Sequence, residues 1–223
     1  MKNNIQNSFE SGSFYYDDFT EIQSLTGARL MSFFEQNFSK KSNNFTRAID
    51  LGCGTGEFSK KVLKKVPINE LLLLDFSKNM LKISKKKINK KIKVSNVNFD
   101  TFNNFENFDL VYSNMSLHWS NNIEVLIKKI FLKLKSNAVF FFSFPNDESF
   151  KELKKIYETN NKVYNLNLLP VHKNILDLFD IDLCEIKDEE VNFSKAYDTP
   201  LHFLKELKLI GAGASKNLKR NSI

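Results

Sequence analysis

Three glycines at alternate positions follow an aspartate in the stretch Asp50-Leu-Gly-Cys-Gly-Thr-Gly56. An apolar run of strand length, Arg47 to Leu51, leads into this stretch, and a helical pattern follows it. A tight glycine turn between a strand and a helix lets a ligand lie against the backbone, because no side chain stands in the way. The stretch therefore predicts a cofactor site.

Two classes of cofactor bind at turns of this kind. A dinucleotide site uses Gly-x-Gly-x-x-Gly, with a pyrophosphate over the helix N-terminus. Counting from Gly52 puts Glu57 at the third glycine position, and counting from Gly54 puts Ser59 there. S-adenosylmethionine (SAM) has no phosphate and carries a cationic sulfonium and an amino group. Asp50 and Glu57 suit such a cation, so the loop favours SAM over a dinucleotide.

Two further aspartates follow expected strands. Asp75 lies where an acid can accept both ribose hydroxyls in either cofactor class. Alternatively, its carboxylate serves only the N-terminus of the helix that begins near Ser77. Asp100 follows the third expected strand and is the candidate acceptor for the adenine amino group, with a simple turn aspartate as the alternative.

These stretches occur in a characteristic order: Asp50 to Gly56, then Asp75-Phe-Ser-Lys-Asn-Met-Leu81, then Asp100, then Phe108-Asp-Leu-Val-Tyr-Ser-Asn114. The series resembles the ordered motifs of class I SAM-dependent methyltransferases. The resemblance implies that the loop faces the methionyl part, Asp75 the ribose, and Asn114 the floor beneath the sulfonium. The cofactor-binding residues expected in total are Tyr16, Gln23, Asp50, Gly52, Cys53, Gly54, Gly56, Asp75, Phe76, Met80, Asp100, Thr101 and Asn114.

Apolar runs alternate with helical patterns along the chain, which is typical of a mostly parallel sheet with helices on both faces. We therefore expect an α/β, Rossmann-like fold. Strands are expected at residues 47–51, 70–75, 93–99, 108–114 and 138–144, with a weaker one at 183–193. Helices are expected at residues 14–38, 57–66, 78–91 and 123–135, and from Thr199-Pro200 to Gly211.

One domain is expected, because the chain has no internal repeat and no Pro- or Gly-rich linker. Its parts would be a helical lid, a SAM-binding core, and acceptor-side helices with an edge strand, at residues 1–44, 45–145 and 146–223 of the whole span 1–223. The residues after Ala214 are expected to fray.

The composition of the chain bears on its localisation, on metal or disulfide sites and on its partners. Neither a secretory leader nor a membrane-spanning run is present in the sequence, so a cytoplasmic protein is expected. Cys53 and Cys184 follow no metal-ligand spacing, so neither a metal nor a disulfide is expected. The net charge of +7 comes mostly from lysines interspersed with asparagines, which favours a compositional bias over nucleic-acid binding. Steering toward an acidic partner is the alternative.

The absence of two motifs reduces the number of possible classes of methyl acceptor. Enzymes that methylate exocyclic amines of bases carry Asn/Asp-Pro-Pro-aromatic, whereas this chain has Asn114-Met-Ser-Leu. Methylation at carbon 5 of pyrimidines needs a cysteine nucleophile, usually after proline, and neither cysteine follows one. Oxygen, nitrogen or small-molecule acceptors are left.

Three stretches resemble the malonyl-acyl carrier protein O-methyltransferases of biotin synthesis. The first is Phe9, Tyr16 and Gln23 at seven-residue steps; the second is Ser113-Asn-Met-Ser-Leu-His-Trp119, where His118 replaces the usual glutamine; the third is Leu207-Lys-Leu-Ile-Gly-Ala212. The middle stretch is shared with aconitate-type enzymes, but the outer two together are more selective. Members of this family continue into a further helix and a final antiparallel strand, so we expect the sheet here to lack that strand.

The resemblance implies methyl transfer to the free carboxylate of malonyl-acyl carrier protein, with the carrier protein as partner. A carboxylate with a pKa of about 4 is already ionised at neutral pH, so no obligatory catalytic base is expected. Tyr16 is the candidate for closing over the cofactor, or else packs as a surface aromatic. His118 and Trp119 are candidates for contacting the acceptor, with simple packing as the alternative.

Two other functions stay open: an aconitate-type carboxyl methyltransferase, and a SAM-binding protein without catalysis. A monomer is expected. The lysines at 85, 86, 87, 90, 91 and 93 would form a solvated helix face or attract an acidic carrier protein.

Overall fold

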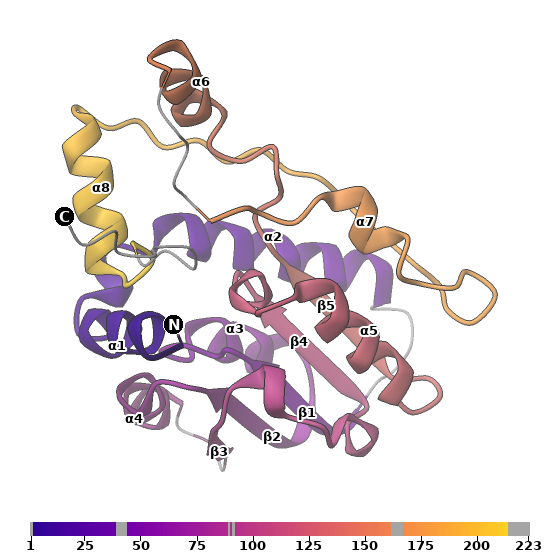
Figure 1. The fold of residues 1–223 in the computed structure, drawn as a ribbon. Helices are drawn as coiled ribbons and strands as arrows, with labels where there is room; N and C mark the ends of the chain where they lie inside the picture. The colour runs from indigo at the N-terminus through magenta and orange to yellow at the C-terminus, as the bar shows by residue number, and fades with distance from the viewer. Residues whose placement is uncertain (1, 39–43, 89, 91, 162–166, 214–223) are drawn as a thin grey trace.

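The fold is that of a computed structural model, which describes residues 2–38, 44–88, 90, 92–161 and 167–213. Five parallel strands form one sheet in the order β3-β2-β1-β4-β5 (Figure 1). Their bounds are β1 Phe45–Leu51, β2 Ile68–Asp75, β3 Ile92–Asn96, β4 Leu110–Asn114 and β5 Val139–Ser143. The strand order reverses between β1 and β4. Ligands of open α/β sheets bind at such a switch point, outside the carboxyl ends of the strands.

Eight α-helices and four short 3₁₀ helices are assigned in the described residues. The α-helices are α1 Lys2–Gly12, α2 Glu21–Phe38, α3 Glu57–Lys65, α4 Lys78–Lys87, α5 Ile123–Lys133, α6 Lys151–Thr159, α7 His172–Leu176 and α8 Pro200–Leu209. The 3₁₀ helices are η1 Tyr16–Asp18, η2 Phe99–Thr101, η3 Phe105–Asn107 and η4 Leu117–Trp119.

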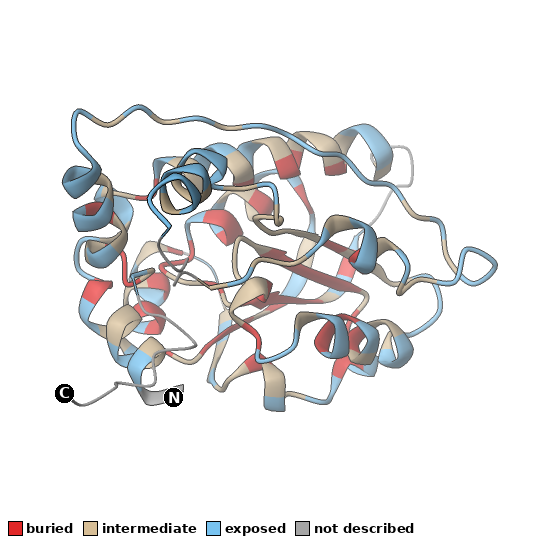
Figure 2. Ribbon diagram, turned by 45° about the horizontal axis from the view of Figure 1, so that its top comes forward, coloured by how far each residue is buried: buried red, intermediate tan, exposed pale blue. Residues whose placement is uncertain are grey.

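Two apolar clusters lie on opposite faces of the sheet. Helices α2, α3 and α4 pack on one face, against residues that include Ala48, Leu73 and Tyr112. Helices α5 and α7 pack on the other, against residues that include Ile49 and Val111. Consecutive strand residues alternate between the clusters because side chains of a strand point to opposite faces in turn. Figure 2 shows the central strands and the inner sides of these helices as buried.

The sequence predicted the architecture well. Five strands were placed within about three residues of their ends, and α3, α4 and α5 within about four. The residues 89 and 91 of the predicted helix 78–91 lie outside the described part, as does the tail from 214 onward. The Thr199 hydroxyl caps α8 by accepting the His202 N–H, and Gly211 follows the helix with a φ of 81°. In the described part of the chain no antiparallel strand joins the sheet, as expected.

The weak strand predicted at 183–193 is wrong. These residues form an extended, mostly exposed segment that pairs with no strand (Figure 2). Leu183 is 72% exposed and Val191 44% exposed, so these two apolar residues are not buried against the sheet. Charges hold it instead: Arg29 on α2 makes a two-pronged contact with Glu189.

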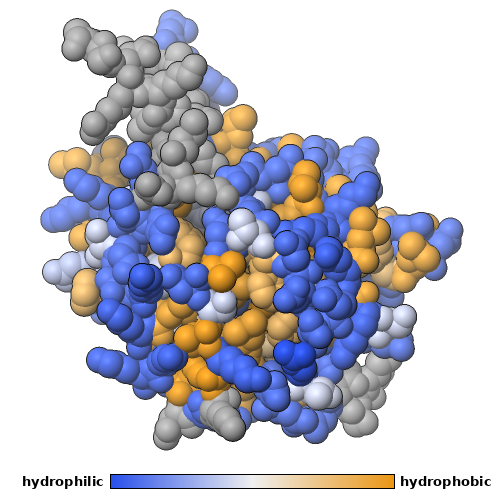
Figure 3. Space-filling view, turned by 60° about the horizontal axis from the view of Figure 1, so that its bottom comes forward, coloured by the Kyte–Doolittle hydropathy of each residue, from blue (hydrophilic) through white to orange (hydrophobic). Residues whose placement is uncertain are grey.

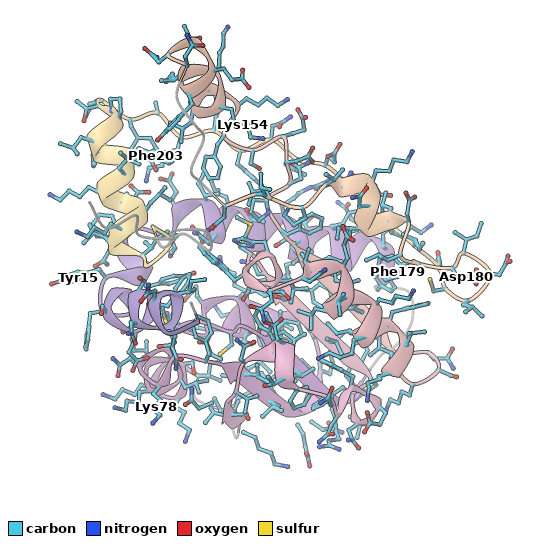
Figure 4. The ribbon with its side chains drawn as sticks, in the orientation of Figure 1. Tyr15, Lys78, Lys154, Phe179, Asp180 and Phe203 are labelled. Atoms are coloured by element: carbon cyan, nitrogen blue, oxygen red, sulfur yellow. The ribbon has the colours of Figure 1, made fainter. Side chains whose placement is uncertain are left out.

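The helix predicted at 14–38 is also partly wrong. The chain forms α1 first, passes through η1, and begins α2 only at Glu21. Phe14 and Tyr15, which the prediction included, are 75% and 55% exposed in the turn between the two helices. Figure 4 shows Tyr15 at the outer edge of this turn. Helices were expected within residues 146–223, but no bounds were predicted for α6 and α7, which lie in the segment after β5.

Candidate cofactor site

The glycine loop after β1 has a backbone that other residues could not adopt without strain. Gly52, Gly54 and Gly56 have φ values of 71°, 53° and 80°. A Cβ at Gly52 would overlap the Ser116 hydroxyl, and one at Gly56 would lie 2.9 Å from the Cβ of Ser84 on α4. The loop therefore owes its shape to glycine, and it brings α3 close to the strand ends.

A cavity of about 50 Å³ lies over this loop. It opens between η1 and the first turns of α2 on one side and the loop and α3 on the other. The residues that line it are Tyr16, Asp17, Thr20, Gln23, Ser24, Gly27, Asp50, Gly52, Cys53, Gly54, Thr55, Glu57, Phe58, Lys61 and Asn114. Seven of the predicted cofactor residues are among them, from four separate segments of the chain.

Asp50 is a carboxylate held inside the fold at the end of β1. Only 1% of it is exposed, and its Oδ2 accepts the hydroxyl of Ser59 at 2.6 Å. Burial raises the pKa of Asp50 to about 7; the Ser59 hydrogen bond opposes this effect, and the charge of Asp75 adds to it. The carboxylate is thus costly to ionise unless a cation comes near it.

Asp75 lies at the end of β2, next to the same loop. Its Oδ2 accepts the N–H of Gly54 at 2.9 Å, and its Oδ1 accepts the N–H of Ser77 at 2.8 Å. Burial raises the pKa of Asp75 to about 6, against the lowering effect of these backbone donors, while the Glu10 charge also raises it. Part of the alternative considered for Asp75 is therefore observed, because it serves the start of α4.

Asn114, at the end of β4, is fixed from three sides. Its Oδ1 accepts the Ser143 hydroxyl at 2.8 Å, and its Nδ2 donates to the carbonyl oxygen of Gln23 at 2.9 Å. A Cβ at Gly27 of α2 would stand 3.1 Å from that Nδ2. Met115 follows with a φ of 52°, a left-handed conformation that is strained for a side-chain-bearing residue, and its N–H donates to Ser143.

The N-terminal segment covers the neighbouring strand end. Glu10 of α1 accepts the hydroxyl of Ser77 and, at 3.2 Å, the N–H of Asn79, at the start of α4. Gln6 donates to the carbonyl oxygen of Phe76 at 2.8 Å. Helix α1 thereby lies over the segment that follows Asp75.

Tyr16 comes from the 3₁₀ turn beyond α1 and approaches the glycine loop. Its ring carbon Cε1 would be 3.8 Å from a Cβ at Gly54. Burial, with Asp75 and Asp17 close by, raises the pKa of Tyr16, so it stays a neutral phenol. The next residue, Asp17, accepts the Thr55 hydroxyl and the Lys87 ammonium, each at 2.6 Å. The turn is therefore bound to both the loop and α4.

Aromatic rings form a second group of predicted residues. Phe9 of α1 stands edge-on to both Phe76 and Trp119, with ring centroids 5.9 and 5.2 Å apart. His118 lies against Trp119, with centroids 5.1 Å apart. Packing of His118 and Trp119 is thus observed, and neither lines the cavity over the glycine loop.

Asp100 occupies the turn after β3. Its Oδ1 accepts the Ser120 hydroxyl at 2.5 Å and its Oδ2 the Asn121 N–H at 3.2 Å, so it joins this turn to the segment that follows η4. Thr101 donates to the Asn98 carbonyl in the same turn. The predicted residues outside the cavity lining are Gly56, Asp75, Phe76, Met80, Asp100, Thr101, His118 and Trp119.

The first and third stretches that resemble the carrier protein enzymes meet in space. A Cβ at Gly211 would lie 2.8 Å from the Cα of Phe9, and one at Gly12 would lie 2.9 Å from the backbone nitrogen of Gly211. The end of α8 therefore packs directly on α1 (Figure 1). Phe9 of the first stretch therefore contacts the third stretch at Gly211.

The sequence did not single out several lining residues. Gly27 interrupts a helical pattern, which was a usable signal, because a glycine inside a helix often marks close packing. Three further residues, Ser59, Tyr112 and Ser143, do not line the cavity but carry the hydrogen bonds behind Asp50 and Asn114, and nothing in their local sequence indicates this.

The residues present fit SAM. The cavity is bounded by bare glycine backbone and by Asp50, whose buried carboxylate lies near the equally buried Asp75. Two carboxylates forced together in a site of low polarity favour a positively charged ligand over an anionic one. Among the described residues, no group of three or more His, Cys, Asp or Glu side chains is placed to hold a metal ion. None of the described helices is long and apolar enough to span a membrane. Figure 3 shows one face of the molecule, on which hydrophilic side chains surround a smaller hydrophobic area.

The chain is similar in sequence to known methyltransferases. A family model described as a methyltransferase domain matches residues 49–140. The chain is 27% identical to malonyl-[acyl-carrier protein] O-methyltransferase 2 of Ilyobacter polytropus, over 96% of this chain and 82% of that protein. It is 34% identical to the enzyme of that name from Buchnera aphidicola, over 74% of this chain and 64% of the relative.

Solved structures share the fold. A SAM-dependent methyltransferase from Thermotoga maritima matches with a TM-score of 0.54 and 18% identity, over 78% of each chain. The N-methyltransferase NodS from Bradyrhizobium japonicum matches with a TM-score of 0.52 and 13% identity, over 71% of this chain and 82% of that chain. The chain therefore contains a methyltransferase domain, and its fold is that of the class I SAM-dependent methyltransferases.

Proposed function

We propose that this enzyme methylates the free carboxylate of a malonyl group carried on acyl carrier protein, as a step in biotin synthesis. The observation that carries the proposal is the similarity to proteins of that name along nearly the whole chain. The contact between Phe9 and Gly211 adds support, because it joins the two stretches on which the resemblance to this family depends.

The proposed methyl transfer requires alignment of the two reacting groups and no proton transfer. Bound SAM supplies an electrophilic methyl group on a sulfonium, which leaves as a neutral thioether when a carboxylate oxygen takes the methyl. A malonyl carboxylate with a pKa of about 4 is ionised at neutral pH and needs no base. The protein's part is to fix the two groups in line and to exclude water.

In this proposal the cofactor is held by the residues around the loop. Asp50 and the glycine backbone face its cationic methionyl end, Asp75 accepts from the ribose, and Asp100 and Thr101 lie toward the adenine. Gln23 and Asn114 shape the floor below the sulfonium, with Phe76 and Met80 beside the nucleoside. His118 and Trp119 lie on the acceptor side.

The N-terminal segment acts as a lid in the proposed cycle. Tyr16 and Asp17 of η1 line the cavity, and α1, which precedes this turn, holds the segment after Asp75 through Gln6 and Glu10. Closure over the bound cofactor would then exclude water from the site. The protein would act as a cytoplasmic monomer, and size-exclusion chromatography with light scattering checks its mass.

The direct test is methyl transfer from labelled SAM. Purified protein is incubated with malonyl carrier protein, with unacylated carrier protein, and with free malonate or aconitate. The proposal expects a base-labile methyl ester on the malonyl carrier protein alone. Transfer to the free acids instead would assign an aconitate-type reaction, and SAM binding without transfer to any of them would contradict the proposal.

The ribose assignment has its own test. Replacing Asp75 with alanine should remove hydrogen bonds to a charged acceptor that are worth about 1.5 to 3 kcal/mol each. The dissociation constant for SAM, measured by calorimetry, should rise at least tenfold. An unchanged constant would remove Asp75 from the cofactor site.

A further inference from the structure

A buried chain of hydrogen bonds leads from Asp50 into the core. The Ser59 hydroxyl on α3 lies 2.6 Å from Asp50 Oδ2 and 2.7 Å from the hydroxyl of Tyr112 on β4. Ser59 and Tyr112 are both fully buried, and neither lines the cavity that Asp50 lines. These hydrogen bonds therefore support Asp50 from the side that a ligand does not reach.

The direction of the protons in this chain follows from their number. Oδ2 of an ionised Asp50 can only accept, so the single Ser59 proton must point toward it. The Ser59 oxygen then accepts, and the Tyr112 hydroxyl is the donor. Both hydroxyl dipoles are aligned toward the carboxylate, and each hydrogen bond strengthens the next in a site of low polarity.

This alignment opposes strong effects in the other direction. Burial raises the pKa of Asp50 first of all, and the charge of Asp75 on β2 raises it further. Burial likewise raises the pKa of Cys53 in the loop and of Tyr112, so both stay neutral beside Asp50. On the cavity side, the charged or titratable groups are Lys61 and Glu57 from α3, and Tyr16 and Asp17 from η1.

We propose that Ser59 and Tyr112 are positioning residues that keep Asp50 ionised and correctly oriented for the cationic end of SAM. Tyr112 can play this part because its hydroxyl reaches from β4 to the Ser59 hydroxyl on α3. The inference rests on the proposed contact of Asp50 with the cofactor, and it is independent of which acceptor is methylated.

The alternative is that Tyr112 only fills the core. Its ring does pack, edge-on to Phe58 and stacked on Phe141, with ring centroids 5.8 and 5.4 Å apart. Phenylalanine would keep both ring contacts and remove only the hydroxyl. The Tyr112→Phe variant therefore separates the two roles.

The experiment measures the dissociation constant for SAM by calorimetry from pH 6 to pH 8, for the wild type and Tyr112→Phe. Without the aligned hydroxyl, protonation of Asp50 should begin at higher pH. If its pKa moves up by about half a unit to one unit, binding should weaken about three- to tenfold at pH 6 and at most about twofold at pH 8. Tyr157→Phe on α6, which loses the same hydroxyl away from the site, should match the wild type at every pH.

Two further variants keep the result decisive. Ser59→Ala removes the direct hydrogen bond and should shift the pH profile at least as far as Tyr112→Phe, and thermal melts check that both variants fold. Asp50→Asn should weaken binding with little pH dependence left in this range. A Tyr112→Phe profile that overlies the wild type, or that is displaced equally at all pH values, overturns the proposal. Unchanged binding by Asp50→Asn overturns the role of Asp50 itself. Neither result bears on the carrier protein assay.

Discussion

The Ser143 hydroxyl donates to Asn114 Oδ1 at 2.8 Å, so the edge strand β5 sets the orientation of a side chain at the centre of the site. The same hydroxyl accepts the N–H of Met115, whose φ of 52° marks a strained turn. The Ser143 carbonyl oxygen accepts the same N–H at 3.1 Å, so Ser143 fixes both the Asn114 amide and the start of the segment that leads to His118.

Replacing Ser143 with alanine should therefore slow methyl transfer more than it weakens SAM binding. Losing a hydrogen bond worth about 0.5 to 1.5 kcal/mol, and with it the amide orientation, should lower kcat about three- to tenfold. The dissociation constant for SAM should stay within about twofold of the wild type. Single-turnover and calorimetric measurements check the two effects separately.

Ser136→Ala is the matched control for this prediction, because Ser136 is exposed in the loop before β5. It should leave both quantities unchanged. Equal losses in kcat and in SAM affinity for Ser143→Ala would show that Ser143 supports the fold of the whole site and does not orient Asn114 specifically.

The sequence predicted those features of the fold and the site that depend on residues close together in the chain. The runs Leu71 to Leu74 and Phe140 to Phe142 reveal strands because their burial follows from their own composition. The glycine loop is equally local. The segment containing Val191 was misread, because its apolar residues alternate with charged ones as in a strand but meet no partner.

Features that depend on distant contacts could not be predicted. A helical lid was expected at residues 1–44, but α1 could not be delimited within it, because its only large apolar residues are Ile5 and Phe9. It is stabilised by packing on α4 and α8. Ser59 meets Tyr112 across 53 positions of sequence, and Asn114 meets Gln23 across 91. Such pairs become visible only when the sheet brings the elements together.

Replacing Gly27 with alanine should destabilise the protein, although alanine is the better helix former. The added Cβ would stand 3.0 Å from the Phe58 ring and 3.1 Å from Asn114 Nδ2. Overpacking costs about 1 to 3 kcal/mol, whereas the gain in helix propensity is about 1 kcal/mol, so the steric cost should win. Thermal melts should show a lower Tm, and SAM binding should weaken because the added methyl group enters the cavity that Gly27 lines together with Phe58 and Asn114.

The control for Gly27 is Gln36→Ala, at an exposed position of the same helix. It brings a better helix former with no neighbour to displace, so its Tm should equal or exceed that of the wild type. A Gly27→Ala protein with a raised Tm and unchanged SAM affinity would mean that α2 can move away from Asn114 without cost.

Asp50 should destabilise the cofactor-free protein at neutral pH. Its pKa is raised from an ordinary value near 3.8 to about 7 in the folded state, so folding favours the protonated form. This contribution to stability is fully present below the unfolded pKa and is lost as the pH rises through the folded value. The free energy of unfolding associated with Asp50 should therefore fall between about pH 4 and pH 8.

Asp50→Asn should remove this loss and raise the Tm at pH 8, by about 2 to 4 °C for each kcal/mol relieved. The difference from the wild type should shrink toward pH 5. Asp198→Asn, at an exposed position before α8, removes one negative charge elsewhere and should show no such pattern. Melts across pH in the absence of SAM test this, and a Tm gain that is the same at pH 5 and pH 8 would contradict it.

Gly211 should control how α8 holds the N-terminal helix. Its φ is 81°, and a Cβ there would come within 2.8 Å of the Phe9 Cα and the Ser8 carbonyl oxygen. Alanine would be strained by about 1 to 2 kcal/mol in this conformation and would also push α1 away. Because Glu10 and Gln6 of α1 cover the segment after Asp75, we expect a raised KM for SAM and faster proteolysis near the N-terminus.

Gly213→Ala is the matched control, since its Cβ would meet nothing closer than 3.3 Å, at the Lys208 Cα. It should stay close to the wild type in both measurements. If the two variants behaved alike, the position of α8 on α1 would not control SAM binding, and the prediction would be wrong. A defect confined to Gly211→Ala, seen in the KM for SAM but not in kcat at saturating SAM, would instead show that α8 acts on cofactor capture through α1, as the Phe9 contact requires.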